Sequence, residues 1–502
     1  MKNLIEIASI VTKKKVRKIE IFDDSSLKNK SSKFNEFYEA LLANKFTNDR
    51  DASLFLYNCQ PTDDKYRQLK SRFRKRLLNT LFFLDVNTPS TSNYDRAYFS
   101  CKKEWSLVKI LELNDAMNAA ADQASQILTT ALKFKFADIV VDCAGMLRRF
   151  AAENDLDKEY EQFDKLVKEY TAVREVEIKS EEYYQRTVMY YYNPISQNQE
   201  QLEKINDYCD ELVSLSEIHD SPVVLYNMYL VWVYRFEINR DWEAMLEVCN
   251  RAESYVENNP VYYQENKVST FQIKKMTAYL HLRDYKNGKV NAEKSLQRFE
   301  EGSAIWFTFL EYYVLLAIHT DNYLNALAIM NRAINQPKLK KLKTESRDKW
   351  VVYEAYLNFF TENPSTQTLA SQASKRRVFK VAKFLTDQPH HSKEAKILTM
   401  HTMVAQILFH LKRKSFPAAT EVIERLKLFS TRQLKPDEYF RTLQFVKMLQ
   451  QLPKANYKTS DLSNIEKYQL RLQAEPYTYR GMIQEIEVLP YDKLWDIILK
   501  ML

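Results

Sequence analysis

The sequence predicts an all-α protein made of consecutive helix pairs. Three observations lead to this fold class: glycine is scarce, an apolar pattern recurs with helical spacing, and short polar segments separate the copies. The chain has 502 residues but only four glycines, where average usage would give roughly 35. Strand hairpins and phosphate-binding loops need the backbone freedom of glycine at many places, whereas helix pairs need it at few.

The recurring pattern is an aromatic or long apolar residue followed by smaller apolar residues at offsets of 3, 7 and 10. These offsets lie on one face of a helix. The four clearest copies are Trp242, Met245, Cys249, Ala252; Tyr285, Gly288, Ala292, Ser295; Tyr323, Ala326, Met330, Ala333; and Phe416, Ala419, Ile423, Leu426. Weaker copies are Phe136, Ile139, Cys143, Met146 and Leu202, Ile205, Cys209, Leu212. We expect these faces to pack closely against neighbouring helices.

Each clear copy follows another apolar helix and a short polar turn. Asp284 and Asn322 stand at two of these turns, and we expect their side chains to cap the helices that follow. From Cys209 to Met330, successive copies are about 40 residues apart. The sequence therefore predicts helix–turn–helix units repeated along the middle of the chain.

These units resemble the tetratricopeptide-like (TPR-like) family of helical repeats. In that family the second helix carries a small residue near its start and another seven positions later. Ala326 and Ala333 match this rule here, as do Gly288 and Ser295. The resemblance implies a right-handed α-solenoid, in which each helix pair buries its apolar side against the next pair.

Two ends of the chain lie outside the repeats. We expect three domains: a basic helical N-terminal module at 1–90, a TPR-like helical array at 91–430, and C-terminal helices at 431–502 that cap the array. Within the N-terminal module, the segments 34–44, 47–58 and 62–84 read as three helices separated by short turns.

The N-terminal module also holds most of the positive charge. Residues 1–85 contain 18 Lys and Arg against 11 Asp and Glu, a net charge of +7 where the whole chain has +8. This asymmetry supports a second hypothesis, in which the module binds nucleic acid through phosphate contacts. The residues expected to make these contacts are Lys13, Lys14, Lys15, Arg67, Lys70, Arg72, Arg74 and Lys75. The competing interpretation is the ordinary solvated face of an amphipathic helix.

The sequence offers no recognisable catalytic motif. Nucleotide-binding glycine loops, the GxSxG nucleophile turn, HExxH and CxxC are all missing from it. We therefore expect no enzyme activity, no catalytic residues, no cofactor and no metal site. The five widely spaced cysteines indicate reduced thiols in a cytoplasmic protein. No apolar run is long enough for a membrane span, so no membrane partner is expected.

Tyrosines gather between Tyr183 and Tyr192. Three of them are consecutive and cannot all point inward from one helix, so at least one should face solvent or a groove. Because tyrosine suits peptide recognition, the expected partner-binding residues are Tyr184, Tyr190, Tyr191 and Tyr192. The leading hypothesis is a non-catalytic scaffold or adaptor that binds a peptide or protein on the concave face of the array. The alternative is a regulator that contacts nucleic acid through residues 1–85 and senses a partner with its repeats.

Overall fold

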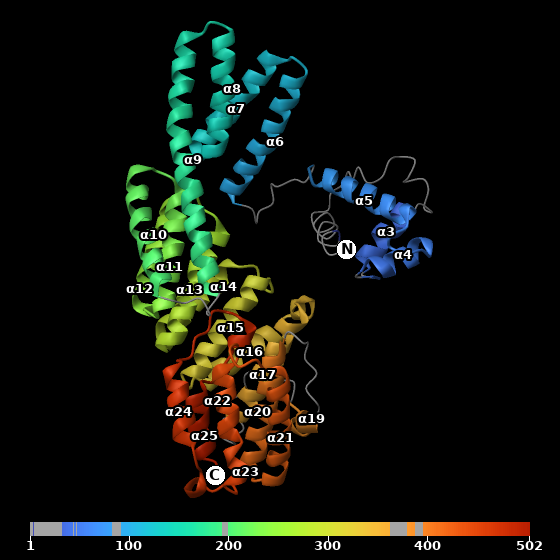
Figure 1. The fold of residues 1–502 in the computed structure, drawn as a ribbon, viewed down its shortest axis with the longest axis vertical. Coiled ribbons are helices and arrows are strands. Elements are labelled where there is room, and N and C mark those ends of the chain that lie inside the picture. Colours follow the sequence, from blue (N-terminus) through green and yellow to red (C-terminus); the bar gives the residue numbers. More distant parts are fainter. Residues whose placement is uncertain are drawn as a thin grey trace. The chain divides into compact units, whose positions relative to one another are not determined.

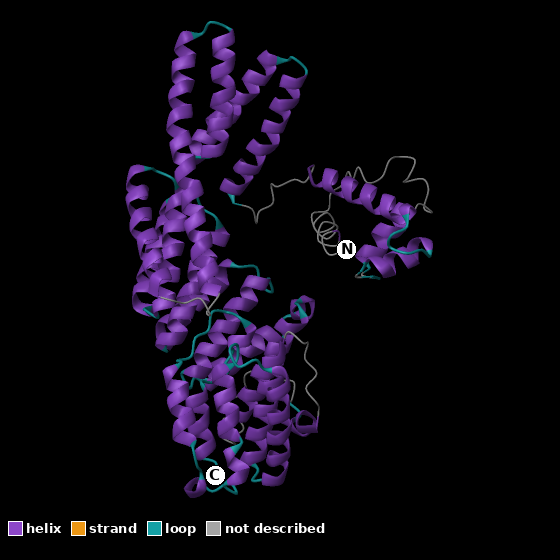
Figure 2. Ribbon diagram, in the orientation of Figure 1, coloured by secondary structure: helices purple, strands orange, loops and turns teal. Residues whose placement is uncertain are grey.

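The protein is described by a computed structural model that covers residues 4, 33–43, 45–46, 48–82, 92–192, 199–361, 379–386 and 395–502. Regular structure within these ranges is entirely helical (Figure 2). The all-α prediction is confirmed. Among the described helices, none combines the length and the hydropathy needed to span a bilayer. The chain divides into two compact units.

The first unit comprises the residues up to Lys179, together with the loops at 219–222 and 259–264. Its first three helices surround a small aromatic core that includes Phe37, Tyr66 and Phe73. These helices are α3 (Lys33–Leu42), α4 (Asp49–Tyr57) and α5 (Asp64–Phe82) (Figure 1). They correspond to the three helices expected in the N-terminal module.

The rest of the first unit consists of longer helices, and the first three of them pack one against the next along the chain. They are α6 (Asn93–Leu113), α7 (Met117–Phe134), α8 (Ala137–Glu153) and α9 (Asp157–Tyr192), the last of which continues into the second unit. Small side chains such as Ala124 and Ala144 are completely buried between them. The charged stretch that begins at Asp157 forms one uninterrupted helix of 36 residues.

The second unit repeats the pairwise packing. Its helices up to residue 361 are α10 (Gln199–Ile218), α11 (Pro222–Asn239), α12 (Trp242–Asn258), α13 (Glu265–Leu282), α14 (Tyr285–Arg298), α15 (Ala304–His319), α16 (Tyr323–Ile334), the 3-10 helix η2 (Pro337–Lys341) and α17 (Thr344–Thr361). Beyond it come α19 (Val381–Thr386), α20 (Lys396–Lys412), α21 (Phe416–Gln433), α22 (Phe440–Leu449), α23 (Gln451–Lys454), η4 (Thr459–Asp461), α24 (Ile465–Ala474), η5 (Ile483–Glu485) and α25 (Tyr491–Leu499).

The recurring apolar pattern lies at the helix contacts. In all six copies, the residues at offsets 3, 7 and 10 are buried. Gly288 shows why small residues occupy some of these positions: a Cβ atom there would lie 2.3 Å from Cδ2 of Leu316 on α15 and 3.1 Å from Cβ of Tyr279 on α13. The absence of a side chain at Gly288 therefore sets how closely α14 approaches both neighbours.

Tight turns join the helices of each pair without glycine. One residue in each turn has a positive φ: Arg240, Arg283, Asp321 and Lys414 in the four clearest pairs. The amide of the next residue donates to a carbonyl five positions earlier at 2.8 to 3.0 Å, which closes the end of the first helix. Each such non-glycine residue costs about 1–2 kcal/mol of backbone strain. The scarcity of glycine is thus compatible with many left-handed turns.

The two expected N-caps behave differently. Asp284 caps α14, since its Oδ1 atom accepts a hydrogen bond from the amide of Asn287 at 3.1 Å. Asn322 makes no such bond to α16. Its side-chain amide instead donates to the carbonyl and to the hydroxyl of Thr320, both at 3.0 Å, so it tightens the turn and leaves the helix end uncapped.

Candidate functional site

The C-terminal part of the second unit contains a segment with little regular structure, residues 475–490, which we call the C-terminal segment. It lies against the first helices of the pairs, namely α13, α15 and α20. Tyr479, Ile486, Val488 and Leu489 are at most 1% exposed. These side chains belong to the same hydrophobic core as the helices, so the segment is an integral part of the second unit.

Three histidines hold the main chain of this segment; His319 and His401 are fully buried and His281 is partly buried. The amide of Tyr479 donates to Nε2 of His281 at 3.2 Å. His319 and His401 bind carbonyl oxygens through Nε2, that of Glu487 at 3.0 Å and that of Ile486 at 2.7 Å. Burial lowers the pKa of His281 to about 3 and those of His319 and His401 to about 4. All three are therefore neutral at pH 7, and each acts as a structural hydrogen-bonding group.

Charged side chains fix the segment at three further points. Arg441 on α22 pairs with Glu487 through two bonds, Nε to Oε1 at 2.6 Å and Nη2 to Oε2 at 3.1 Å. The hydroxyl of Tyr479 donates to Oε1 of Glu311 at 2.7 Å. Arg480 donates to the carbonyl of Tyr191 at 2.6 Å. Both the backbone and the side chains of the segment are thus recognised.

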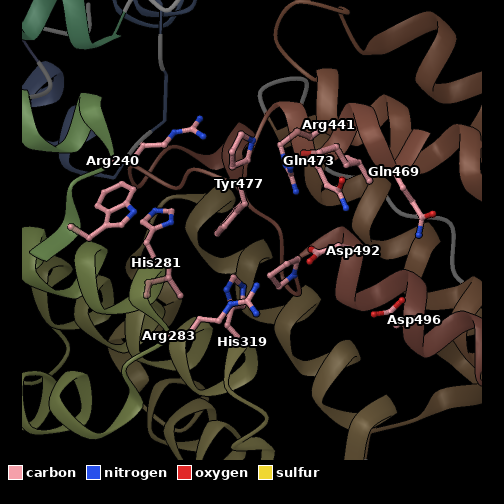
Figure 3. A pocket seen from close by; sticks show the side chains of 15 residues that line it. Arg240, His281, Arg283, His319, Arg441, Gln469, Gln473, Tyr477, Asp492 and Asp496 are labelled. Atoms are coloured by element: carbon pink, nitrogen blue, oxygen red, sulfur yellow. Dashed lines mark hydrogen bonds between the residues drawn. The ribbon is translucent and has the colours of Figure 1, made fainter. Parts of the chain in front are cut away.

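Beside the segment lies an open pocket of about 590 Å³. Figure 3 shows it between side chains of the helix turns and side chains of the C-terminal helices, with Tyr477 between the two groups. The polar and aromatic residues that line it are Arg240, Trp242, His281, Arg283, His319, Arg441, Gln469, Gln473, Tyr477, Asp492 and Asp496. The pocket therefore combines aromatic walls with both signs of charge.

Two of its arginines form no ion pair with the described residues. Arg240 and Arg283 occupy the same turn position in successive helix pairs, and their side chains reach solvent. Neither side chain makes a hydrogen bond to the described part of the chain. Partial burial lowers the pKa of the Arg240 guanidinium. The negative charge of Glu475 raises this pKa, whereas the positive charges of Arg441 and Arg480 lower it further. An anion in the pocket would relieve this concentration of positive charge.

The aromatic wall of the pocket also has an unused polar group. The indole of Trp242 stacks on the imidazole of His281, with ring centroids 4.1 Å apart, and the ring of Tyr477 lies 5.5 Å from that imidazole. The hydroxyl of Tyr477 is buried and has no hydrogen-bond partner in the described ranges. Since such a group normally finds a partner, it is available to a ligand or to water.

The tyrosines expected to bind a partner are divided between core and surface. Tyr190 and Tyr191 are 7% and 1% exposed, whereas Tyr192 is 50% exposed. The hydroxyl of Tyr191 donates to Glu237, which also accepts from Lys274, both at 2.5 Å. Packing accounts for these two buried residues. Tyr184 is partly buried against the core around Phe271, and Tyr192 has the most accessible ring of the four.

The expected nucleic-acid residues also differ in their surroundings. Lys13, Lys14 and Lys15 lie outside the described residues. Lys70 of α5 pairs with Asp49 at 2.6 Å. Arg67 is 3.6 Å from Asp64 in an exposed ion pair. The remaining three, Arg72, Arg74 and Lys75, are exposed on α5.

The pocket is not among the sites predicted from the sequence. Arg240 and Arg283 had a usable signal, because each follows the first helix of a recognised pair directly before an Asp. No group of three or more potential ligand residues for a metal ion occurs within the described ranges. Comparisons of the chain with protein-family models, with curated proteins and with solved structures gave no match.

Proposed function

We propose that this protein is a non-catalytic scaffold or adaptor that binds a protein partner through an acidic segment of that partner. The helix pairs are, in this proposal, TPR-like repeats of a right-handed α-solenoid. One observation carries the binding site: beside an open, aromatic-walled pocket, Arg240 and Arg283 present charges at equivalent turns that pair with none of the described residues. A carboxylate of the partner would pair with these guanidinium groups, as arginine does readily.

The C-terminal segment directs the partner to this pocket. In a TPR-like architecture, a peptide would lie along the first helices of the pairs. Here residues 475–490 already contact α13, α15 and α20. The pocket is the accessible region next to that occupied face. An exposed acidic chain could enter it without displacing any buried side chain.

The test removes both charges without adding backbone strain. Asparagine tolerates positive φ, so the variant is Arg240→Asn/Arg283→Asn. The control is Arg149→Gln/Arg432→Gln, which removes two exposed arginines elsewhere. Binding of a fluorescein-labelled octaglutamate peptide would be followed by anisotropy, and co-purifying proteins would be identified from cells that naturally make the protein.

We expect the pocket variant to bind octaglutamate at least about 10-fold more weakly than the wild type, since each charged hydrogen bond contributes roughly 1.5–3 kcal/mol. A co-purifying protein should be lost from the pocket variant and kept by the control. Equal binding by both variants would refute the pocket. Competition by inorganic phosphate as strong as that by the peptide would instead identify a small anion as the ligand.

A further inference from the structure

Helix α5 presents a face of uncompensated positive charge. From Lys65 to Arg76 it carries seven Lys and Arg, and no acidic residue follows Asp64 in the helix. The other acidic residues in the described part of the module lie in α3, in α4 and at Asp63, in the turn before α5. Within that described part, most of the positive charge is therefore on one helix.

The structure separates the cations of α5 into two groups. Lys70 and Arg76 serve the module itself, because Lys70 pairs with Asp49 and Arg76 lies 5.0 Å from the ring centroid of Phe34. Lys65, Arg67, Arg72, Arg74 and Lys75 are exposed. Of these, only Arg67 has an ion-pair partner in the described part of the chain.

Other charged helices of this protein neutralise their cations locally. Arg186 pairs with Glu182 and Lys168 with Asp164, each one turn away on α9. On α5 the residues one turn apart include the like-charged pairs Lys70 and Arg74, and Arg72 and Arg76. Such pairs destabilise a helix by about 0.2–0.5 kcal/mol each. An external polyanion would convert this cost into binding energy.

The exposed face also contains groups that can read base edges. Gln68 and Ser71 are exposed between the cations, and Asn79 is exposed one turn beyond the last of them. Amide side chains bind adenine and arginine binds guanine in the major groove, which is wide enough to admit a helix. The 19 residues of α5 extend over about 28 Å. This length is enough to contact phosphates on both sides of a groove.

We infer that α5 binds duplex DNA, with its exposed cations on phosphates and its N-terminal half toward the major groove. A membrane surface fits less well. A helix lying in a bilayer surface needs a free apolar side, whereas Tyr66, Phe73 and Leu77 of α5 are at most 1% exposed in the core of the module. Double-stranded RNA is also a poorer match, since its major groove is too narrow for side chains to read.

Fluorescence anisotropy of the full-length protein with a labelled 25-base-pair duplex, from 50 to 300 mM salt, tests the inference. Five phosphate contacts give a slope of log K against log salt of about −4.5. In the test variant Arg72→Gln/Arg74→Gln/Lys75→Gln the slope should fall to about −2, and the affinity at 0.1 M salt should fall by on the order of 10²-fold. Circular dichroism would verify that the variant keeps its helix content.

The matched control is Lys340→Gln/Lys341→Gln/Lys343→Gln, which removes the same charge from exposed residues of the second unit. It should bind the duplex like the wild type. No binding at 50 mM salt, or equal losses in test and control variants, would overturn the inference. Stronger binding to anionic vesicles than to the duplex would do the same. The pocket variant Arg240→Asn/Arg283→Asn should retain DNA binding, so this inference and the proposed function fail independently.

Discussion

Replacement of Arg441 by methionine should strongly destabilise the C-terminal segment. The guanidinium makes two bonds to Glu487 and further bonds to the carbonyls of Leu472 and Glu475. The side chain of Glu487 is only 4% exposed, so Arg441→Met would leave a buried carboxylate with the amide of Tyr491 as its remaining donor, at 3.0 Å. Breaking one side of a buried ion pair typically costs about 3–5 kcal/mol.

Protonation limits this cost. Protonating a carboxyl with an ordinary pKa near 4.5 costs about 3.4 kcal/mol at pH 7. Because burial already raises the pKa of Glu487, this value is an upper bound for that residue. The carbonyls that lose their donor add about 1 kcal/mol. We therefore expect Arg441→Met to cost about 4 kcal/mol at pH 7, and less below pH 5, where Glu487 is readily protonated.

The assay is urea unfolding of the wild type, Arg441→Met, Glu487→Gln and the double variant, with hydrogen exchange of residues 475–491 as the local readout. In the Glu487→Gln background, Arg441→Met should cost only about 1–2 kcal/mol, because no buried charge remains. The coupling energy should then be about 2–3 kcal/mol. If Arg441→Met cost less than about 1 kcal/mol, or if its effect and that of Glu487→Gln simply added in the double variant, the role assigned to this ion pair would be refuted.

Two further predictions concern helix packing and pH. Gly288→Ala should destabilise the protein by about 1–2 kcal/mol, because overpacking outweighs the gain in helix propensity. Gly145→Ala should stabilise it by about 0.5–1 kcal/mol, because a Cβ atom there would meet nothing within 4 Å. Thermal unfolding distinguishes the two variants, and equal shifts of their melting temperatures would contradict the packing at Gly288. Since burial lowers the pKa values of His281, His319 and His401, the unfolded chain binds more protons below pH 6.5. The contribution of each neutral histidine to the free energy of unfolding is therefore present above pH 6.5. It falls as the pH drops, by about 1.4 kcal/mol per histidine at pH 5.5. Urea unfolding at pH 7.5 and 5.5 measures this loss of unfolding free energy, which should be about 1.4 kcal/mol smaller in His401→Gln than in the wild type. The same pH dependence in both proteins would refute the prediction.

The helix pairs could be predicted because their signal is local. A helix that packs on both neighbours needs apolar residues at fixed offsets, and Ala326, Met330 and Ala333 are all buried as that rule requires. Asn322 shows the limit of local reasoning. Its residue type and position suit an N-cap, but the hydroxyl and carbonyl of Thr320 compete for its side chain. The competition depends on the turn geometry, which composition does not specify.

The candidate site depends on contacts between distant residues. His281 and His319 end first helices, and a cap on their own helix or a half-exposed position would have been the ordinary expectation. Both instead bind the main chain of residues 198 and 168 positions away. Main-chain amides and carbonyls have nearly the same chemistry whatever the residue type, so the sequence of the segment carries no mark of the histidines that hold it. The pocket exists only because this segment lies where it does.

The C-terminal segment also restricts how a partner can bind. Burying Tyr479, Ile486, Val488 and Leu489 stabilises the segment by roughly 1.5–3 kcal/mol for each side chain, or about 6–12 kcal/mol together. A partner of micromolar affinity has only about 8 kcal/mol of binding free energy, so it could not displace the segment and still bind at that strength. Any such partner must bind beside the segment. The unpaired arginines at the helix turns are accessible without that displacement, and for this reason the pocket, more than the face of the first helices, is where we place the partner.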